Sequence, residues 1–402
     1  MSTPTAGRAR MPGSRGDRER GALRVTARKL AQTIMSRIPR SGRHRDVLLA
    51  CHNAMTASHL RDFQDVFRGD GRLRFWFCRR RREEGDRLAI STLLPFPEVG
   101  SKWANVRPWD LVVLADHGFT RLCTPGRHPV LRIPHGIGGK MVDGEDYQYS
   151  PHLIQDERGH LRYTCMFESS ESRKRVAVAR DPRLEGVIEV VGCLVLDRLR
   201  MQAADPTQGS RVRTEGGRKR VLVCSSWGSE SLLPRCGDAM LEEMLRLSDR
   251  FEFFVRPHPN LLEADGGNGW RARLAAWGER GIGISWPGED MTEALAASDI
   301  VVGDDLTTMS LYAAALGKPL VLMRSRSAAI PSESFAMRLA AVIPVCSSPQ
   351  ELAGILPGLL ERWPPASLDA IARELACFPG QSGERIRAAV YRLLRLRPLD
   401  GG

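Results

Sequence analysis

Residues 220–323 decide the fold of this chain. Within this stretch the sequence reads RVLVC at 220–224, FEFFV at 251–255, GIGIS at 281–285, IVV at 300–302 and PLVLM at 319–323. Between these apolar runs, hydrophobic residues recur with helical spacing at 238–247, 270–279, 291–297 and 308–315. Short apolar strands that alternate with helices are typical of a parallel sheet. The stretch therefore predicts a doubly wound, Rossmann-like α/β domain.

The N-terminal half shows the same alternation less clearly. Strand-like segments occur at 46–51, 73–78, 111–115 and 130–134, with a helical pattern at 56–67. A chain of 402 residues with 42% hydrophobic content is too long for one ordinary core, so we expect two α/β domains. The expected division is a tail at 1–45, a first domain at 46–185, a connector at 186–218, a second domain at 219–350 and helices at 351–402 that cross back to the first domain.

The positive charge of the chain is concentrated in residues 1–45. This tail holds twelve Arg or Lys residues and two acids, which accounts for +10 of the formal net charge of +12. Within it, Leu30, Ile34 and Ile38 recur every four positions among basic residues, a pattern that suits a basic amphipathic helix. Such a helix could lie on an anionic membrane surface, or it could pack on its own domain. No recognisable nucleic-acid-binding module accompanies the tail, so a nucleic-acid partner is not expected.

The cysteines indicate the cellular compartment. The nine cysteines are widely scattered and contain no Cys-x-x-Cys pair, which predicts reduced, buried thiols rather than disulfides or a zinc site. No signal peptide and no apolar run long enough to span a bilayer is present. We therefore expect a cytoplasmic protein, peripheral on the inner face of the cell membrane if the tail binds lipid.

Three polar motifs each follow a strand-like segment, where open α/β sheets place ligand groups. They are His135-Gly136 with Lys140, then Arg256-Pro257-His258-Pro259, and then Asp305-Leu306-Thr307-Thr308. Together they resemble motifs of the CDP-glycerol glycerophosphotransferase family, the teichoic-acid-type polyol phosphate transferases, in which a His-Gly pair with Lys five positions after the His precedes Arg-x-His-Pro and Asp-Tyr-Ser-Ser. The resemblance implies the GT-B fold, in which two doubly wound domains face each other across a cleft. It covers roughly residues 46–345.

This chain departs from the family pattern at several positions. Leu306 replaces the family's Tyr, and Tyr312 replaces an Asp four residues after the second hydroxyl. The hinge-like segment Gly192 to Asp197 carries Cys193 and Leu194 where Asn and Pro are usual. The changes at Leu306 and Tyr312 are compatible with a phosphate site and leave the nucleotide and the transferred group open.

The histidine motif of the first domain predicts proton transfer on the acceptor side. Imidazole has the ordinary pKa best suited to removing a proton near neutral pH, and the glycine lets backbone approach a ligand closely. His135 is therefore the candidate general base, with Gly136 and Lys140 as acceptor-binding or phosphate-binding residues. The structural alternatives are an ordinary loop histidine and a surface lysine.

The second-domain motifs predict a diphosphate site. Arg256 and His258 alternate along an emerging strand end, and the guanidinium and imidazole together suit a pyrophosphate whose bridging bond breaks. Thr307 and Thr308 open a helix whose N-terminus favours anions, although an ordinary N-cap explains them equally well. Ser225 and Ser226, which precede Trp227 in a loop similar to the family's Pro-Thr-Trp, are further candidates to contact the donor; Trp227 could equally be a core residue.

The resulting hypothesis is a transferase that moves a glycerol phosphate or similar polyol phosphate from a CDP-activated donor to an acceptor hydroxyl, in cell-envelope or glycopolymer synthesis. His135 and His258 are its catalytic candidates, and Arg256, Thr307, Thr308, Ser225 and Ser226 are its donor-binding candidates. The expected partners are the nucleotide-activated donor and a lipid-linked or glycan acceptor, and neither a cofactor nor a metal is expected. One alternative is a UDP-sugar-dependent glycosyltransferase or epimerase of the same fold. Another is a non-catalytic GT-B module that tethers partners at a membrane.

Overall fold

The computed structural model describes residues 44–398, except for 80–89, 118, 120–121, 124, 135, 140, 143–144, 205–216, 264–267, 288, 305–306, 325–333, 366 and a few side chains beside these gaps. Residues 1–43 of the basic tail lie outside the described residues, and so do His135, Lys140 and Asp305. The expectations for these positions remain predictions.

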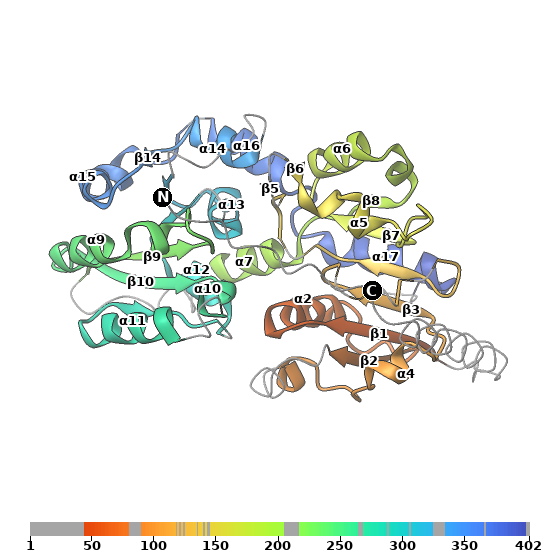
Figure 1. Ribbon diagram of the computed structural model, residues 1–402. Helices are drawn as coiled ribbons and strands as arrows, with labels where there is room; N and C mark the ends of the chain where they lie inside the picture. The colour runs from red at the N-terminus through yellow and green to blue at the C-terminus, as the bar shows by residue number, and fades with distance from the viewer. Residues whose placement is uncertain are drawn as a thin grey trace, which may run out of the picture.

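Two six-stranded parallel sheets form two lobes that lie side by side (Figure 1). The strands of the first sheet are β1 Arg45–Cys51, β2 Leu73–Arg79, β3 Leu111–Leu114, β4 Val130–Arg132, β7 Cys165–Glu168 and β8 Ile188–Val190, in the order β2-β1-β3-β4-β7-β8. Those of the second sheet are β9 Lys219–Ser225, β10 Phe251–Pro257, β11 Gly283–Ile284, β12 Ile300–Gly303, β13 Leu320–Met323 and β14 Val345–Cys346, in the order β11-β10-β9-β12-β13-β14. The second order is that of the Rossmann fold, whose ligand crevice lies where the order reverses, here between β9 and β12.

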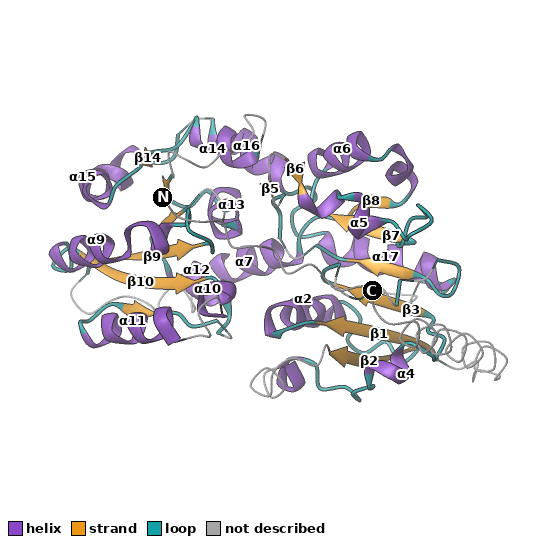
Figure 2. Cartoon of the chain, viewed as in Figure 1, coloured by secondary structure: helices purple, strands orange, loops and turns teal. Residues whose placement is uncertain are grey.

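Helices lie along the faces of both sheets (Figure 2). In the first lobe they are α2 Ala54–Asp65, α4 Ser101–Ala104, α5 Pro151–Ile154 and α6 Glu171–Arg180, beside the short β5–β6 hairpin of Met141–Val142 and Glu145–Asp146. In the second lobe they are α9 Leu232–Arg246, α10 Pro259–Glu263, α11 Asn268–Glu279, α12 Met291–Ala297, α13 Thr308–Ala315, α14 Phe335–Ala340, α15 Pro349–Leu359 and α16 Leu368–Leu375. Helix α7, Leu194–Ala204, joins the lobes, and α17, Ser382–Leu394, ends the described chain.

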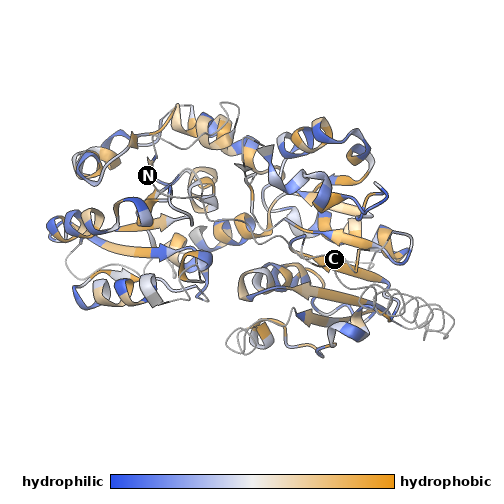
Figure 3. Ribbon diagram, viewed as in Figure 1, coloured by the Kyte–Doolittle hydropathy of each residue, from blue (hydrophilic) through white to orange (hydrophobic). Residues whose placement is uncertain are grey.

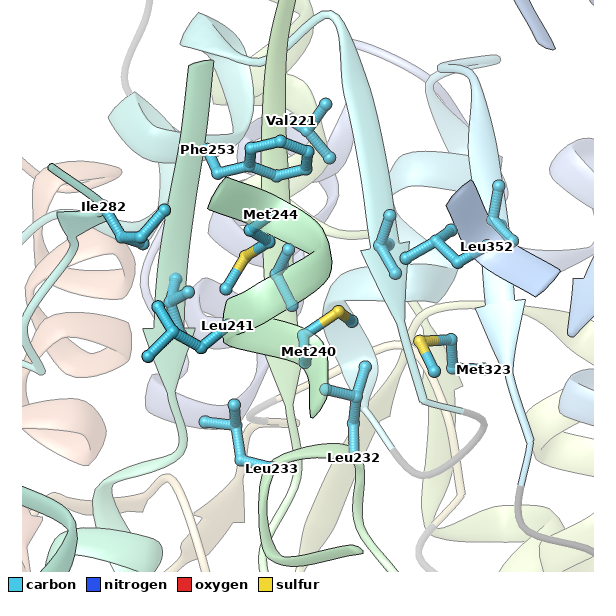
Figure 4. Packing of buried hydrophobic residues seen from close by; sticks show 14 of the residues in the cluster. Val221, Leu232, Leu233, Met240, Leu241, Met244, Phe253, Ile282, Met323 and Leu352 are labelled. Carbon is cyan, nitrogen blue, oxygen red and sulfur yellow. The ribbon is translucent and has the colours of Figure 1, made fainter. Parts of the chain in front are cut away.

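The central strands of the sheets, such as β3 and β12, are apolar and buried on both faces, as expected for parallel strands covered by helices (Figure 3). In the second lobe, Met240 and Met244 of α9 pack over Val221 of β9 and Phe253 of β10 (Figure 4). All four side chains are buried. Burying such a side chain stabilises a fold by about 1.5 to 3 kcal/mol. The first lobe has a separate hydrophobic cluster around β1, β2 and β3, so each sheet has its own core.

Helix α17 returns the chain to the first lobe. Its residues Ile386, Val390 and Tyr391 belong to the core formed by β1, β2 and α2. The hydroxyl of Tyr391 donates to Asp70 Oδ2 at 2.7 Å, which ties the helix to the loop before β2. Helix α17 therefore completes the first domain. The expectation that all helices of 351–402 cross back is wrong for α15 and α16, which pack on the second lobe against α9 and α13.

The hinge-like segment connects the domains through α7. Gly192 has a φ of +90°, and a Cβ there would lie 2.5 Å from Ser382 Oγ, so only glycine fits without strain. Asp197 on α7 accepts hydrogen bonds from the backbone amides of Gly380 (2.7 Å) and Ser382 (3.0 Å). The spacing from Gly192 to Asp197 therefore fixes where α17 begins relative to the connecting helix.

The structure confirms the strands expected within residues 220–323 and adds elements that the sequence pattern did not reveal. Strand β8 lies within the segment 186–218 that was assigned to the connector, so the first sheet extends beyond residue 185. Strands β8 and β14 have three and two residues, which is too short for a periodic signal. All nine cysteines are free thiols, and seven of them are buried.

Candidate active site

A cleft of about 560 Å³ lies between the two domains. Its first wall comes from α2 and α7, including Asn53, Asp62 and Arg198. Its second wall comes from the carboxyl ends of β9 and β10, from α10 and α11, from the loop before α12 and from the start of α13. The volume is within the usual range for small-molecule sites, and the cleft opens at the strand-order reversal of the second sheet.

Arg256 lies at the end of β10, in the second wall of the cleft. Its guanidinium donates to Ser285 Oγ at 2.6 Å and to the backbone carbonyl of Glu289 at 2.9 Å. Among the described residues, no carboxylate forms an ion pair with it, and burial lowers its pKa. A half-buried cation whose hydrogen bonds go only to neutral acceptors is partly desolvated, and an anionic ligand can complete its environment. Arg256 therefore has the surroundings of an anion-binding residue.

His258 follows two residues later and also lines the cleft. Its Nδ1 accepts a hydrogen bond from the backbone amide of Asn260 at 3.1 Å, so the neutral ring carries its proton on Nε2. The indole of Trp227 lies beside the imidazole, with ring centroids 6.4 Å apart, and is 41% exposed. Trp227 is therefore a surface residue near the cleft and not a core residue.

The N-terminus of α13 lies in the same wall. Thr307 is the N-cap, and its side-chain oxygen accepts from the amide of Met309 at 3.4 Å; Thr308 is the first helical residue, and both threonines line the cleft. The first amides of a helix have no partner within the helix and favour anions. The structure thus brings Arg256, His258, Thr307 and Thr308 to one surface.

The His-Gly loop of the first domain reaches this surface. A Cβ at Gly136 would lie 3.0 Å from Thr308 Cγ2, and a Cβ at Gly138 would lie 2.3 Å from Leu311 Cδ1. Ile137 between them is fully buried among residues of the second domain. The two glycines let this loop pack directly against α13, so the two motifs meet across the domain boundary although His135 and Lys140 themselves lie outside the described residues.

The two serines after β9 differ in placement. Ser225 lines the cleft, but its hydroxyl donates to the carbonyl of Ser226 at 3.1 Å and accepts from the amide of Leu233 at 3.0 Å. Ser226 is buried, and its amide donates to the carboxylate of Asp304 at 2.8 Å. Asp304 also accepts from the amide of Leu232, at 3.1 Å. These contacts hold the loop before α9, so a donor-binding role for Ser225 and Ser226 stays a prediction.

An ion network crosses the domain boundary, and the sequence pattern does not predict it. Arg198 Nη1 on α7 lies 3.0 Å from Asp62 Oδ1 of α2 and 3.3 Å from Asp290 Oδ2, the N-cap of α12. Arg61 approaches the same two carboxylates at 3.6 and 3.5 Å. Burial raises the pKa of Asp62 to about 6. In the sequence, Asp290 can be recognised as a helix N-cap because it directly precedes a helical pattern. Arg198 and Asp62 cannot be recognised as partners, because they are 136 residues apart and meet only in the folded protein.

A buried polar network lies behind the His-Gly loop. Glu168 Oε1 accepts from Arg132 Nη1 at 3.0 Å and from the hydroxyl of Tyr149 at 2.6 Å. Arg173 pairs with Asp146, and both side chains are almost fully buried. A Cβ at Gly139 would lie 2.5 Å from Asp146 Oδ2, so this network is in contact with the loop. Because its charges are paired and hydrogen-bonded, it can hold the loop rigidly.

The described part of the chain offers no metal site and no membrane-spanning helix. It contains no cluster of three or more His, Cys, Asp and Glu side chains that could hold a metal ion. It also contains no helix with the length and apolarity needed to cross a membrane.

Comparison with solved structures identifies the fold. A structure of the wall teichoic acid polymerase TagF, in a histidine variant soaked with CDPG, superposes with a TM-score of 0.65 over 95% of this chain and 99% of the other, at 11% identity. The chain has the GT-B fold. The UDP-GlcNAc 2-epimerase of Neisseria meningitidis bound to UDP-GlcNAc gives a TM-score of 0.57 over 87% of this chain and 100% of the other, at 15% identity. The S. aureus MnaA–UDP structure gives 0.58 over 89% and 100%, at 11% identity.

The resemblance inferred from the motifs is thus confirmed at the level of the fold, with two facing Rossmann-like domains. No protein-family model matches the chain, and no curated protein sequence matches it.

Proposed function

We propose that this chain is a transferase that moves a glycerol phosphate or similar polyol phosphate from a CDP-activated donor to an acceptor hydroxyl, in cell-envelope or other glycopolymer synthesis. The observation that carries the proposal is Arg256, a half-buried guanidinium that lines the interdomain cleft and that, among the described residues, donates its hydrogen bonds to neutral acceptors and forms no salt bridge. The motif resemblance and the similarity of fold to TagF support the choice of donor.

In the proposed reaction the donor diphosphate lies against Arg256, His258 and the N-terminus of α13. His135 takes the proton of the acceptor hydroxyl, whose oxygen forms a new bond to the phosphorus next to the polyol. The bond from that phosphorus to the bridging oxygen breaks, and the oxygen leaves on CMP. Arg256 and the Nε2 proton of His258 stabilise the negative charge that develops on the departing phosphate. Every step uses groups of the chain and its substrates.

The second candidate is an enzyme that uses a UDP-sugar on the same fold. It is favoured by the similarity to the N. meningitidis epimerase, whose structure contains UDP-GlcNAc. The two candidates differ in the donor that they bind, so a binding experiment distinguishes them. We expect CDP-glycerol or CDP-ribitol, but not UDP-GlcNAc, to raise the melting temperature of the full chain. A ligand at 100 times its Kd should stabilise the protein by about 2.7 kcal/mol.

A third possibility is a non-catalytic tethering module. Substitution of His135 distinguishes it from the transferase. With the donor that stabilises the protein, release of CMP should be measured for wild type and for His135→Ala. A module without catalysis would show no CMP release from either protein, whereas the transferase requires release that depends on His135.

The basic tail gives the proposed location, peripheral on the inner face of the cell membrane. Removing residues 1–45 should abolish co-sedimentation with vesicles that contain phosphatidylglycerol and leave CDP affinity unchanged. Equal sedimentation of the truncated and full-length proteins would overturn this part of the proposal.

A further inference from the structure

The loop between β11 and α12, of which residues 285–287, 289 and 290 are described, contacts Arg256 directly. Ser285 Oγ and the carbonyl of Glu289 are the two acceptors of its guanidinium. A ligand whose phosphates contact Arg256 therefore also lies close to this loop. Pro287, Glu289 and Asp290 of the loop all line the cleft.

The surroundings of this loop suit a planar ring. Pro259 and Leu262 of α10 line the cleft together with Pro287, and they present apolar surface beside Arg256. Arg271 of α11 also lines the cleft, and its guanidinium lies over the ring of Trp286 at 5.5 Å from the ring centre. The stacking holds Arg271 next to the loop. Apolar walls with a few polar groups at the edge are typical of sites that bind flat ligands.

Two charged side chains at this place differ from the other charged groups of the cleft. Arg61 and Arg198 of the first wall are both paired with Asp62 and Asp290. Among the described residues, neither Glu289 nor Arg271 forms a salt bridge, with each other or with another side chain. The Glu289 carboxylate is close enough to Arg256 for its charge to raise the pKa of that guanidinium, against the lowering by burial. The side chain of Asp290, the other acid of the loop, is engaged by Thr292, whose amide donates to it at 2.9 Å. Glu289 is therefore the carboxylate of this loop that can accept hydrogen bonds from a ligand.

We propose that Glu289 and Arg271 bind the edge of the nucleobase and that Glu289 selects cytosine over uracil. Cytosine carries an exocyclic amino group at position 4, which donates to a carboxylate; uracil carries a carbonyl there, which a carboxylate repels. Both bases present the carbonyl at position 2, to which Arg271 donates. Glu289 thus sets the choice of base, whereas Arg271 adds affinity for either pyrimidine. This inference rests on the proposed function, because it assigns the base subsite of the same donor.

The test is calorimetry of the full chain with CDP, UDP and inorganic pyrophosphate. Wild type should bind CDP more tightly than UDP, by about 5- to 150-fold for one well-placed base contact. Glu289→Gln replaces one carboxylate oxygen with an amide that donates to the uracil carbonyl. It should reduce the preference for CDP by at least about 5-fold. Because the Glu289 charge also acts on Arg256, the affinity for pyrophosphate measures that effect separately, and the ratio of CDP to UDP affinity measures base selection. Glu293→Gln, the same change on an exposed residue of α12 outside the cleft lining, should keep the wild-type preference.

The outcomes separate this inference from the proposal on which it rests. The same ratio of CDP to UDP affinity in Glu289→Gln and wild type would overturn the role of Glu289. Equal binding of both nucleotides by wild type would overturn it as well. If wild type binds neither nucleotide nor pyrophosphate, the proposed function itself fails. Arg271→Ala should weaken CDP and UDP by the same factor, and a change in their ratio would contradict the division of roles.

Discussion

Replacing Arg256 with alanine should weaken CDP binding without destabilising the folded protein. In the free protein the guanidinium donates hydrogen bonds to Ser285 Oγ and the carbonyl of Glu289, and burial lowers its pKa although the nearby carboxylates of Glu289 and Asp290 act in the opposite direction. Two hydrogen bonds to neutral groups offset the cost of burying the charge only in part. Removing the cation therefore removes a desolvation cost together with these bonds, and we expect the free energy of unfolding to change by less than about 1 kcal/mol.

The effect on the ligand should be larger. A charge-assisted contact to a phosphate contributes about 1.5 to 3 kcal/mol, which corresponds to a loss of CDP affinity on the order of 10- to 150-fold. The assay is titration calorimetry with CDP at fixed salt, because screening weakens exposed charge pairs. Arg246→Ala is the matched control, since Arg246 is an exposed residue of the same domain that pairs with Glu243. Unchanged CDP affinity in folded Arg256→Ala would refute the assignment of Arg256 as the anion-binding residue.

Three further predictions concern other parts of the chain. His135→Ala should lower turnover by roughly 100- to 10,000-fold while CDP affinity stays within about twofold of wild type; near-normal CMP release would remove His135 as the base. Burial raises the pKa of Asp62 from 3.8 to about 6, so the folded state holds this proton more strongly than the unfolded state, and wild type loses stability as the pH rises through this range. The difference in unfolding free energy between wild type and Asp62→Asn should therefore fall by up to about 3 kcal/mol from pH 4 to pH 7, and parallel pH curves would contradict the raised pKa. Tyr391→Phe removes the hydroxyl that donates to Asp70 and should cost about 1.5 kcal/mol in urea denaturation; no loss would show that α17 is held by apolar packing alone.

The second domain was largely readable from the sequence because its local signals agree with its tertiary structure. Helices α12 and α13 begin and end at the residues expected from the pattern. Their N-caps, Asp290 and Thr307, each have a side chain that accepts from a backbone amide of the first turn. The run at 251–255 forms the first five residues of β10, in which Phe251, Phe253 and Val255 are buried. Such residues specify their structure through near neighbours in the chain.

The elements that were missed depend on partners far away in the sequence. Strand β7 reads Cys-Met-Phe-Glu, and its Glu168 is buried because Arg132 and Tyr149 hydrogen-bond to it. The sequence around residue 168 gives no sign of these partners. The motifs His135-Gly136 and Arg256 to Pro259 pointed to the cleft because their spacing resembles a known family. The pairing of Asp62 with Arg198 has no such pattern.

The most direct test of the central claim is a crystal structure of the full chain with CDP-glycerol. The account predicts that the diphosphate lies between the two domains, with its oxygens within hydrogen-bonding distance of the Arg256 guanidinium and the first amides of α13. A donor bound outside the interdomain cleft, or bound within it with its phosphates away from Arg256, would contradict the account.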